Sequence, residues 1–238
     1  MNLNNFIILP TYNERSNVSE LIPLIFKLHP DINILVVDDN SPDNTAQEVK
    51  NLQARFNKLE LLEREKKEGL GRAYIAAFKE VLKKDNVDLI IMMDADFSHD
   101  PRYLSVMFDK ARDFDLLIGS RYIAEGGIES WEKWRRFLSR AGNVYCRFVL
   151  RKPIFDWTAG FNCIKADFLR KIDFGKLNFS GYAFIISLKY YLLEAGAKVK
   201  EIPIIFKARR EGESKLSHHI IWEGVLTPWR LFFSKTKK

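Results

Sequence analysis

The sequence predicts an α/β fold in which a mainly parallel sheet carries helices on both faces. Through the first half of the 238-residue chain, short apolar segments rich in Val, Ile and Leu alternate with longer segments of helical spacing. The apolar segments have few polar interruptions, which is typical of parallel strands buried on both faces. Polar clusters follow these segments directly, and they favour a ligand site at the carboxyl ends of the strands.

The first half contains five expected strands and the helices between them. The strands are expected at residues 6–10, 32–39, 59–64, 87–96 and 115–122. The helix-like segments are expected at residues 11–28, 40–56, 69–84 and 101–113. Asp100 and Pro101 favour the start of the last helix, because Asp caps helices well and Pro fits the first helical position.

The second half is less regular. We expect a helix at 131–153, a short strand within 155–165, a nearly all-round apolar helix at 181–196 and a strand from residue 198 that leads into a charged loop. The arginines of the first of these helices form either a solvated basic face or a contact for phosphate or membrane. The sequence does not decide between these two interpretations.

The C-terminal segment, residues 217–238, combines tryptophans and phenylalanines with a basic tail, and we separate it from a domain at 1–216. Aromatic residues interleaved with lysines suit the surface of a bilayer. The alternative is a helix packed on the domain or on a second subunit. Pro228 is expected to interrupt such a helix.

Composition restricts the class of protein further. The net charge of +7 suggests anionic partners, although no nucleic-acid-binding motif accompanies it. The cysteines Cys146 and Cys163 form neither a metal-binding pair nor a disulfide framework, and we expect both to be reduced and buried. The N-terminal apolar run is too short for a signal peptide, and no run approaches the ~20 residues that span a bilayer. We therefore expect a cytoplasmic protein, either soluble or bound to the membrane surface.

Two aspartates, Asp94 and Asp96, end an apolar strand-like run and raise the question of what they bind. Two carboxylates ~4 Å apart repel by about 4 kcal/mol at an effective dielectric of 20. The preference of Asp for turns and helix caps explains many such pairs. A divalent cation is the alternative, since Mg²⁺ takes carboxylate oxygens and leaves positions for substrate phosphates. The polar clusters after neighbouring strands favour the metal and phosphate interpretation.

Other nucleotide-binding motifs are missing from the sequence. No G-x-G-x-x-G follows a strand, which disfavours a dinucleotide dehydrogenase. The glycines of Gly69–Arg72 lack the G-K-[ST] of a P-loop, so they mark either a phosphate contact or a helix start that permits close packing. The four histidines lack the spacing of a zinc protease.

Taken in order, the motifs resemble those of the dolichyl- or polyprenyl-phosphate mannosyltransferases, which are inverting family 2 glycosyltransferases of GT-A (Rossmann-like) fold. The resemblance covers about residues 6–216. It rests on "PTYNE", "VVDDNSPDNT", "GLGRAYIAAF", "DADFSHDP", "GSRY", "DWTAGF", "GYAF" and "EIPIIFKARREGESKL". The last of these is the most specific, because family 2 members in general lack it.

The resemblance implies a role for each matching residue. It places the metal, Mg²⁺ or Mn²⁺, at Asp94 and Asp96, with Ser98 at a position where many relatives have a glutamine ligand. It places the sugar nucleotide at Pro10, Tyr12, Glu14, Val37, Asp39 and Asp94. It places the acceptor phosphate at Arg121, Arg135, Ser139, Arg209 and Lys215. Asp96, Arg121 and Lys215 are the implied catalytic residues, and Asp156 either orients the site or caps a turn.

The implied reaction moves mannose from GDP-mannose to a polyprenyl phosphate in one displacement with inversion. An ionised phosphate acceptor needs positive groups to position it rather than a strong base. The same fold acting with UDP-glucose or another sugar nucleotide is the alternative, and a non-catalytic nucleotide- or lipid-binding relative is a remote one. Expected partners are the sugar nucleotide, the lipid phosphate and a membrane surface, but no nucleic acid. The sequence does not decide whether a separate protein anchors the chain to the membrane.

Overall fold

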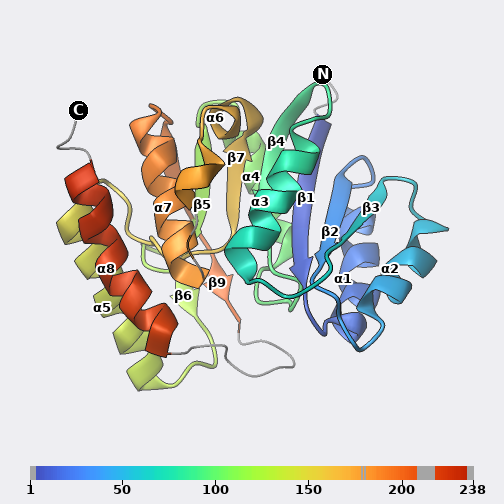
Figure 1. Cartoon of the computed structure of the whole chain (residues 1–238), viewed down its shortest axis with the longest axis horizontal. Coiled ribbons are helices and arrows are strands. Elements are labelled where there is room, and N and C mark those ends of the chain that lie inside the picture. Colours follow the sequence, from blue (N-terminus) through green and yellow to red (C-terminus); the bar gives the residue numbers. More distant parts are fainter. Residues whose placement is uncertain (1–3, 178, 180, 208–217, 235–238) are drawn as a thin grey trace.

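A seven-stranded sheet forms the centre of the molecule (Figure 1). The computed structural model describes residues 4–177, 179, 181–207 and 218–234. The strands of the large sheet are β1 (Asn4–Thr11), β2 (Asn33–Asp38), β3 (Leu59–Glu63), β4 (Val87–Met92), β5 (Leu116–Ser120), β7 (Asn162–Lys165) and β8 (Val199–Pro203). They lie in the order β3-β2-β1-β4-β7-β5-β8, while β6 (Gly127–Ile128) and β9 (Ile205–Phe206) form a separate small sheet.

All neighbouring strands of the large sheet run parallel except β7, which is antiparallel to both β4 and β5. The predicted α/β fold with a mainly parallel sheet is therefore confirmed. Because β7 runs the opposite way, it begins at the edge where the parallel strands end. Its first residue, Asn162, pairs with Met92 of β4 and Ile118 of β5. This reversal brings the chain before β7 to the predicted site.

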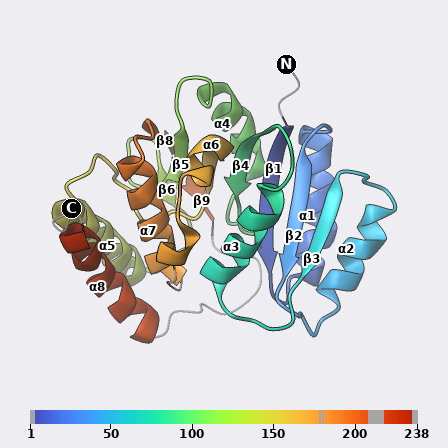
Figure 2. The ribbon, with the colours of Figure 1, turned by 45° about the horizontal axis from the view of Figure 1, so that its top comes forward.

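Helices cover both faces of the sheet, as Figures 1 and 2 show. One face carries α3 (Leu70–Val81), α5 (Lys133–Leu150), α6 (Ala166–Arg170), η2 (Phe174–Leu177), α7 (Gly181–Glu194) and α8 (His218–Ser234). The other carries α1 (Arg15–Leu28), α2 (Thr45–Gln53), η1 (Pro101–Tyr103) and α4 (Leu104–Lys110). The predicted start at Asp100 is confirmed, since its carboxylate accepts a hydrogen bond from the N–H of Arg102 at 3.0 Å.

Two hydrophobic cores form because successive residues of a strand point to opposite faces. In β1, Phe6 and Ile8 lie in the core beneath α3 and α7, whereas Ile7 lies in the core beneath α1 and α2. Both cores need apolar residues, which explains the continuous apolar runs in the sequence. Cys146 and Cys163 are free and buried, one in each core, as predicted.

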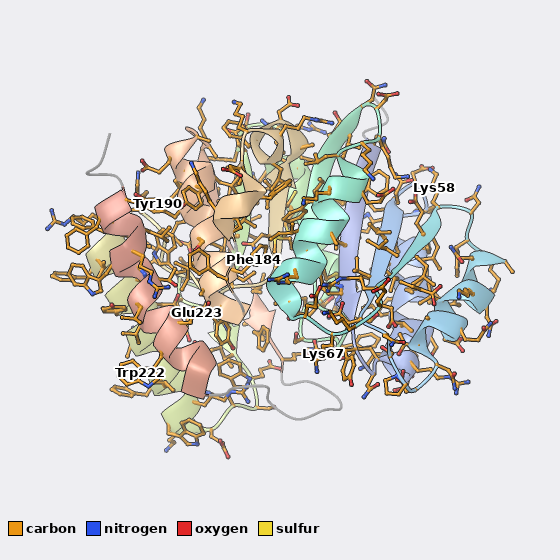
Figure 3. The ribbon with its side chains drawn as sticks, viewed as in Figure 1. Lys58, Lys67, Phe184, Tyr190, Trp222 and Glu223 are labelled. Atoms are coloured by element: carbon orange, nitrogen blue, oxygen red, sulfur yellow. The ribbon has the colours of Figure 1, made fainter. Side chains whose placement is uncertain are left out.

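The glycines at the start of α3 serve close packing. A Cβ added at Gly71 would lie 2.5 Å from the carbonyl oxygen of Phe179 and 2.9 Å from the ring of Phe184. Beside it, Tyr74 stacks on Phe184 with ring centroids 6.0 Å apart. Figure 3 shows Phe184 between α7 and α3. The packing interpretation of this glycine pair is therefore the correct one for Gly71.

Helices α5 and α8 lie side by side at one end of the molecule (Figures 1 and 2). The expectation that Pro228 interrupts the C-terminal helix is wrong, because α8 continues through it to Ser234. A proline removes one backbone hydrogen bond, and packing against neighbouring helices offsets that loss. Leu231 is buried, and the Tyr145 hydroxyl of α5 donates to the Val225 carbonyl of α8 at 2.6 Å.

Candidate active site

The polar clusters predicted from the sequence meet at the edge where the parallel strands end, which is the lower edge of the sheet in Figure 1. Hydrogen bonds connect the loops there. The N–H of Asp39, after β2, donates to the carbonyl of Thr11, at the end of β1, at 3.1 Å. The N–H of Arg121, after β5, donates to the carboxylate of Asp156, before β7, at 3.0 Å. Loops from distant parts of the chain thus build one polar surface.

The loop after β4 carries both aspartates of the DAD motif. The strand expected to reach residue 96 ends at Met92, so Asp94 and Asp96 lie beyond it. Asp96 is 3% exposed, and its Oδ1 accepts bonds from the Ser98 N–H at 3.1 Å and hydroxyl at 2.6 Å. The buried His99 ring accepts a bond at Nδ1 from the Asp94 N–H at 2.9 Å. The hydrogen bonds typical of a turn are therefore present, and they fix the positions of the two carboxylates.

Both carboxylates act on the same buried group, the hydroxyl of Tyr74. Burial raises the pKa of the Tyr74 hydroxyl well above its ordinary value, and the charges of Asp94 and Asp96 raise it further. The Asp94 side chain keeps 27% of its surface exposed. A Cβ added at Gly160 would lie 3.8 Å from an Asp94 oxygen, which is an ordinary contact distance, so the chain before β7 lies beside that carboxylate.

The donor set fits a divalent cation that is shared with a substrate. No group of three or more His, Cys, Asp or Glu side chains in the described part of the chain could hold a metal ion by itself. Mg²⁺ commonly binds through one or two carboxylates together with water and substrate phosphates. Asp94 and Asp96 match this requirement, whereas the Ser98 hydroxyl donates its hydrogen to Asp96.

The residues after β2 form a network of charges. Asp39 pairs with Arg64 at 2.5 Å, and Arg64 also pairs with Glu68 at 2.7 Å. Burial raises the pKa of Asp39, although the charge of Arg64 acts against this shift. Asp38 accepts hydrogen bonds from the hydroxyls of Thr11 and Ser41 at 2.8 and 2.6 Å. These bonds hold the ends of β1 and β2 together.

The remaining residues implied in nucleotide binding lie around this network. Tyr12 lies beneath the ammonium of Lys67, which is 3.7 Å from the ring centroid and appears near the lower edge of the sheet in Figure 3. Glu14 accepts a bond from the Asn17 amide at 2.7 Å and precedes α1. Pro10 is half-buried. Val37 is fully buried in the core, so only its backbone could contact a ligand.

Arg121 and Asp156 form a buried ion pair with two parallel hydrogen bonds of 2.8 Å. Nη2 of Arg121 also donates to the Thr158 hydroxyl at 2.8 Å. Burial opposes ionisation of Asp156, but the charge and hydrogen bonds of Arg121 hold its pKa below the ordinary value. Among the described residues, these bonds use three of the five guanidinium N–H groups, and the two on Nη1 are the ones that could donate to a ligand.

Arg135 and Ser139 lie on α5 near this pair. The Arg135 guanidinium stacks 4.2 Å from the centre of the Trp131 ring, and the Arg121 guanidinium lies 5.8 Å from the same ring. Ser139 accepts a bond at its carbonyl from Asn143 at 2.9 Å. The two arginines therefore flank one tryptophan.

Two implied residues fall in the part of the chain that the structure does not describe. Arg209 and Lys215, which the resemblance places at the acceptor phosphate, lie outside the described residues. Their positions stay predictions from the sequence.

Three residues around Asp156 were missed by the sequence reasoning. Glu201 of β8 accepts the N–H bonds of residues 155 and 156, and Asn143 of α5 accepts those of residues 157 and 158. Lys189 of α7 is 1% exposed and donates to three carbonyls of the same loop. A lysine alone in an apolar helix was the available signal, because such a charge needs buried partners.

Comparison with known proteins connects this geometry to a family. The chain matches the model of glycosyl transferase family 2 over residues 6–173. It is 37% identical over 226 residues to the undecaprenyl-phosphate mannosyltransferase of Micrococcus luteus, covering 94% of this chain and 93% of that protein. It is 39% identical over 222 residues to the polyprenol monophosphomannose synthase of Mycolicibacterium smegmatis, covering 92% of this chain and 83% of that protein.

Solved structures share the fold at lower sequence identity. Glucosyl-3-phosphoglycerate synthase from Mycobacterium tuberculosis, solved with Mn²⁺, UDP and phosphoglyceric acid, aligns with a TM-score of 0.66 and 16% identity, over 95% of this chain and 78% of that one. A mannosyltransferase from Pyrobaculum calidifontis, solved with GDP-Man and Mn²⁺, aligns with a TM-score of 0.60 and 15% identity. The alignment covers 98% of this chain and 64% of that one. At these identities the likeness establishes the GT-A-like fold.

Proposed function

This chain belongs to the family 2 glycosyltransferases, and on that basis we propose that it transfers mannose from GDP-mannose to a polyprenyl phosphate with inversion. One observation carries the proposal: the Asp94/Asp96 pair and the buried Arg121–Asp156 pair share one edge of the sheet. This arrangement offers anionic groups for a metal–diphosphate and a cationic group for a second phosphate. The two relatives at 37% and 39% identity, whose names specify mannosyl transfer or polyprenol phosphomannose synthesis, support the choice of sugar and acceptor.

The donor end of the proposed site lies at β1, β2 and β4. Asp94 and Asp96 would hold Mg²⁺ or Mn²⁺, which when bound neutralises the charge that develops on a diphosphate leaving group. The rim formed by Pro10, Tyr12, Glu14 and Asp39, with the backbone of Val37, would receive the nucleoside. Lys67, which already lies over Tyr12, adds a positive charge beside this rim.

The acceptor end lies at β5 and α5. A phosphate monoester is largely ionised at pH 7, since its second pKa is about 6. Its oxygen attacks the anomeric carbon while the bond from that carbon to the diphosphate oxygen breaks, so no bond to the protein forms. Arg121 and Arg135 would orient the phosphate, with Ser139 beside them and with Arg209 and Lys215 as further expected contacts.

The direct test is a transfer assay with the purified protein. It combines labelled GDP-mannose, Mg²⁺ and a short polyprenyl phosphate in detergent, and counts the label extracted into organic solvent. We expect label in the lipid phase that disappears with EDTA. Transfer from UDP-glucose alone would keep the mechanism and change the sugar, whereas no transfer from any sugar nucleotide would refute the proposed function.

A second part of the proposal concerns the end of the molecule formed by α5 and α8. We define its apolar face by the exposed side chains Trp134, Phe137, Leu138, Val144, Phe148, Trp222, Val225, Leu226, Trp229 and Phe233. Large exposed apolar patches of this kind mark interaction sites. Figure 3 shows Trp222 at the outer edge of α8, directed away from the sheet.

The chemistry of the apolar face suits lipid. A groove of about 490 Å³ on α5 is lined by Phe137, Arg140, Ala141, Val144, Tyr145 and Phe148. The same two helices carry exposed arginines, including Arg140 and Arg230, which matches the aromatic and basic composition of surface-bound helices. No helix among the described residues is long and apolar enough to cross a membrane. We propose that the apolar face lies on the surface of an anionic bilayer, where a polyprenyl phosphate would be embedded.

We expect charged substitutions on the apolar face to weaken binding to membranes. Phe137→Glu or Phe148→Glu should each reduce co-sedimentation with anionic phospholipid vesicles by about tenfold, since burial of a phenylalanine contributes about 1.5–3 kcal/mol. Val106→Glu is the matched control, because Val106 is an exposed apolar residue on α4 at the opposite face of the sheet. Equal vesicle binding by all three variants would contradict a membrane role for this face.

A further inference from the structure

Lys189 is a buried lysine whose ammonium contacts one loop at three points. Its Nζ donates to the carbonyl oxygens of Asp156 at 2.8 Å, Trp157 at 3.2 Å and Ala159 at 2.9 Å. An ammonium has three N–H donors and no acceptor, so every donor is used. Removing such a group from water is costly, and packing of α7 alone would be served equally well by an apolar side chain.

The same loop, residues 155–159, is bound from its other sides as well. Glu201 accepts the N–H bonds of Phe155 and Asp156 at 2.8 and 2.9 Å. Asn143 accepts those of Trp157 and Thr158 at 2.6 and 3.2 Å. The loop therefore directs its carbonyls to α7 and its N–H groups to β8 and α5. In this arrangement the side chain of Asp156 faces Arg121.

We propose that Lys189 is a positioning residue for transfer to the acceptor: its ammonium fixes the 155–159 loop so that Asp156 holds Arg121 in the orientation that binds the acceptor phosphate. The last step of this inference rests on the proposed function. The first step, control of the loop by Lys189, rests on the hydrogen bonds alone.

The protonation of Lys189 matters to this arrangement. Burial lowers its pKa to about 7, against the opposing charges of Asp156 in the loop and Glu201 on β8. Arg121 at the end of β5 lowers this pKa further, while Cys146 on α5 acts in the raising direction. A neutral amine has two N–H groups and a lone pair, so it cannot donate to all three carbonyls. As the pH rises past 7, the loop loses at least one of its bonds.

The test compares Lys189→Met with Lys152→Met. Lys152, which follows α5, pairs with Glu194 of α7 at 2.7 Å, so the control removes an equal charge that contacts the same helix and leaves the hydrogen bonds of the loop in place. We expect Lys189→Met to lower kcat/KM for polyprenyl phosphate roughly 100-fold, as misplacement of a positioning group does. The KM for the sugar nucleotide should stay unchanged. The wild-type kcat/KM for the acceptor should decline above pH 7, and this decline should be absent from the variant.

A spectroscopic measurement separates the loop from the reaction. With 5-fluorotryptophan incorporated, the ¹⁹F resonance of Trp157, assigned with a Trp157→Phe variant, reports on the loop itself. It should shift with pH in the wild type and in Lys152→Met, but not in Lys189→Met. If Lys189→Met does not fold, Lys189→Gln, which offers two uncharged donors, takes its place with the same expectation.

The outcomes are distinguishable. A Trp157 resonance and an acceptor kcat/KM that are both unchanged by substitution of Lys189 would overturn the inference. If the wild type transfers no sugar, the proposed function fails, yet the fluorine resonance still decides whether Lys189 controls the loop. A loss of kcat/KM for donor and acceptor alike, with no pH difference, would indicate a merely structural lysine and would also overturn the inference.

Discussion

Replacing Asp96 with asparagine should lower the rate of mannosyl transfer roughly 1000-fold, because several kcal/mol of charge stabilisation at the leaving diphosphate is lost. The carboxamide keeps the size of the side chain and one acceptor oxygen for Ser98, so the loop after β4 can keep its shape. The expected result is a folded protein with almost no transfer at any concentration of Mg²⁺ or Mn²⁺. The measurement is the initial rate of transfer across a titration of metal.

Two companion variants separate metal binding from turn chemistry. Ser98→Ala removes the 2.6 Å hydrogen bond to Asp96 without removing a carboxylate, and we expect it to retain most of the activity. Asp109→Asn removes a charge from an exposed position on α4 and should leave the rate unchanged. A loss in Ser98→Ala as large as that in Asp96→Asn would show that the turn, rather than the metal, requires Asp96.

The sequence predicted that residues after β1, β2 and β4 meet at one edge of the sheet, because that placement depends on local order. Each strand of the parallel sheet ends at the same edge, so residues that follow β1, β2 and β4 meet there once the strands are recognised. Asp39 and Asp94 were placed at this edge in this way, and their roles stay predictions. The apolar runs identified the strands, since both faces of the sheet are buried.

The contacts of Arg121 and Asp156 could not be predicted to the same extent, because they join distant segments of the chain. The direction of β7 is not encoded by its short apolar run, yet it determines where Asp156 lies. The bond from Lys189 to Asp156 joins residues 33 positions apart, and that from Asp156 to Glu201 joins residues 45 apart. The prediction that Pro228 interrupts the C-terminal helix was wrong for a related reason. Tertiary packing of α8 outweighs the local tendency of proline to break a helix.

Breaking the buried pair by Asp156→Asn should lower the free energy of unfolding by about 3–5 kcal/mol, because Arg121 then keeps its charge without a partner. The pair is more than nine-tenths buried, so solvent cannot replace the lost carboxylate. Transfer should also fall steeply, because the guanidinium is no longer held for the acceptor phosphate. Denaturant unfolding and the transfer assay measure the two effects separately. Asp115→Asn is the control, since Asp115 pairs with the more exposed Lys165 at the opposite edge of the sheet.

The double variant Arg121→Met with Asp156→Leu decides what the pair is for. Replacing both members of a buried ion pair with apolar residues commonly restores stability, because no charge is left unpaired. We therefore expect the double variant to unfold at a denaturant concentration near that of the wild type while transferring no mannose. Recovery of transfer together with stability would mean that the pair serves folding alone, and the acceptor phosphate would then have to be bound by other positive groups.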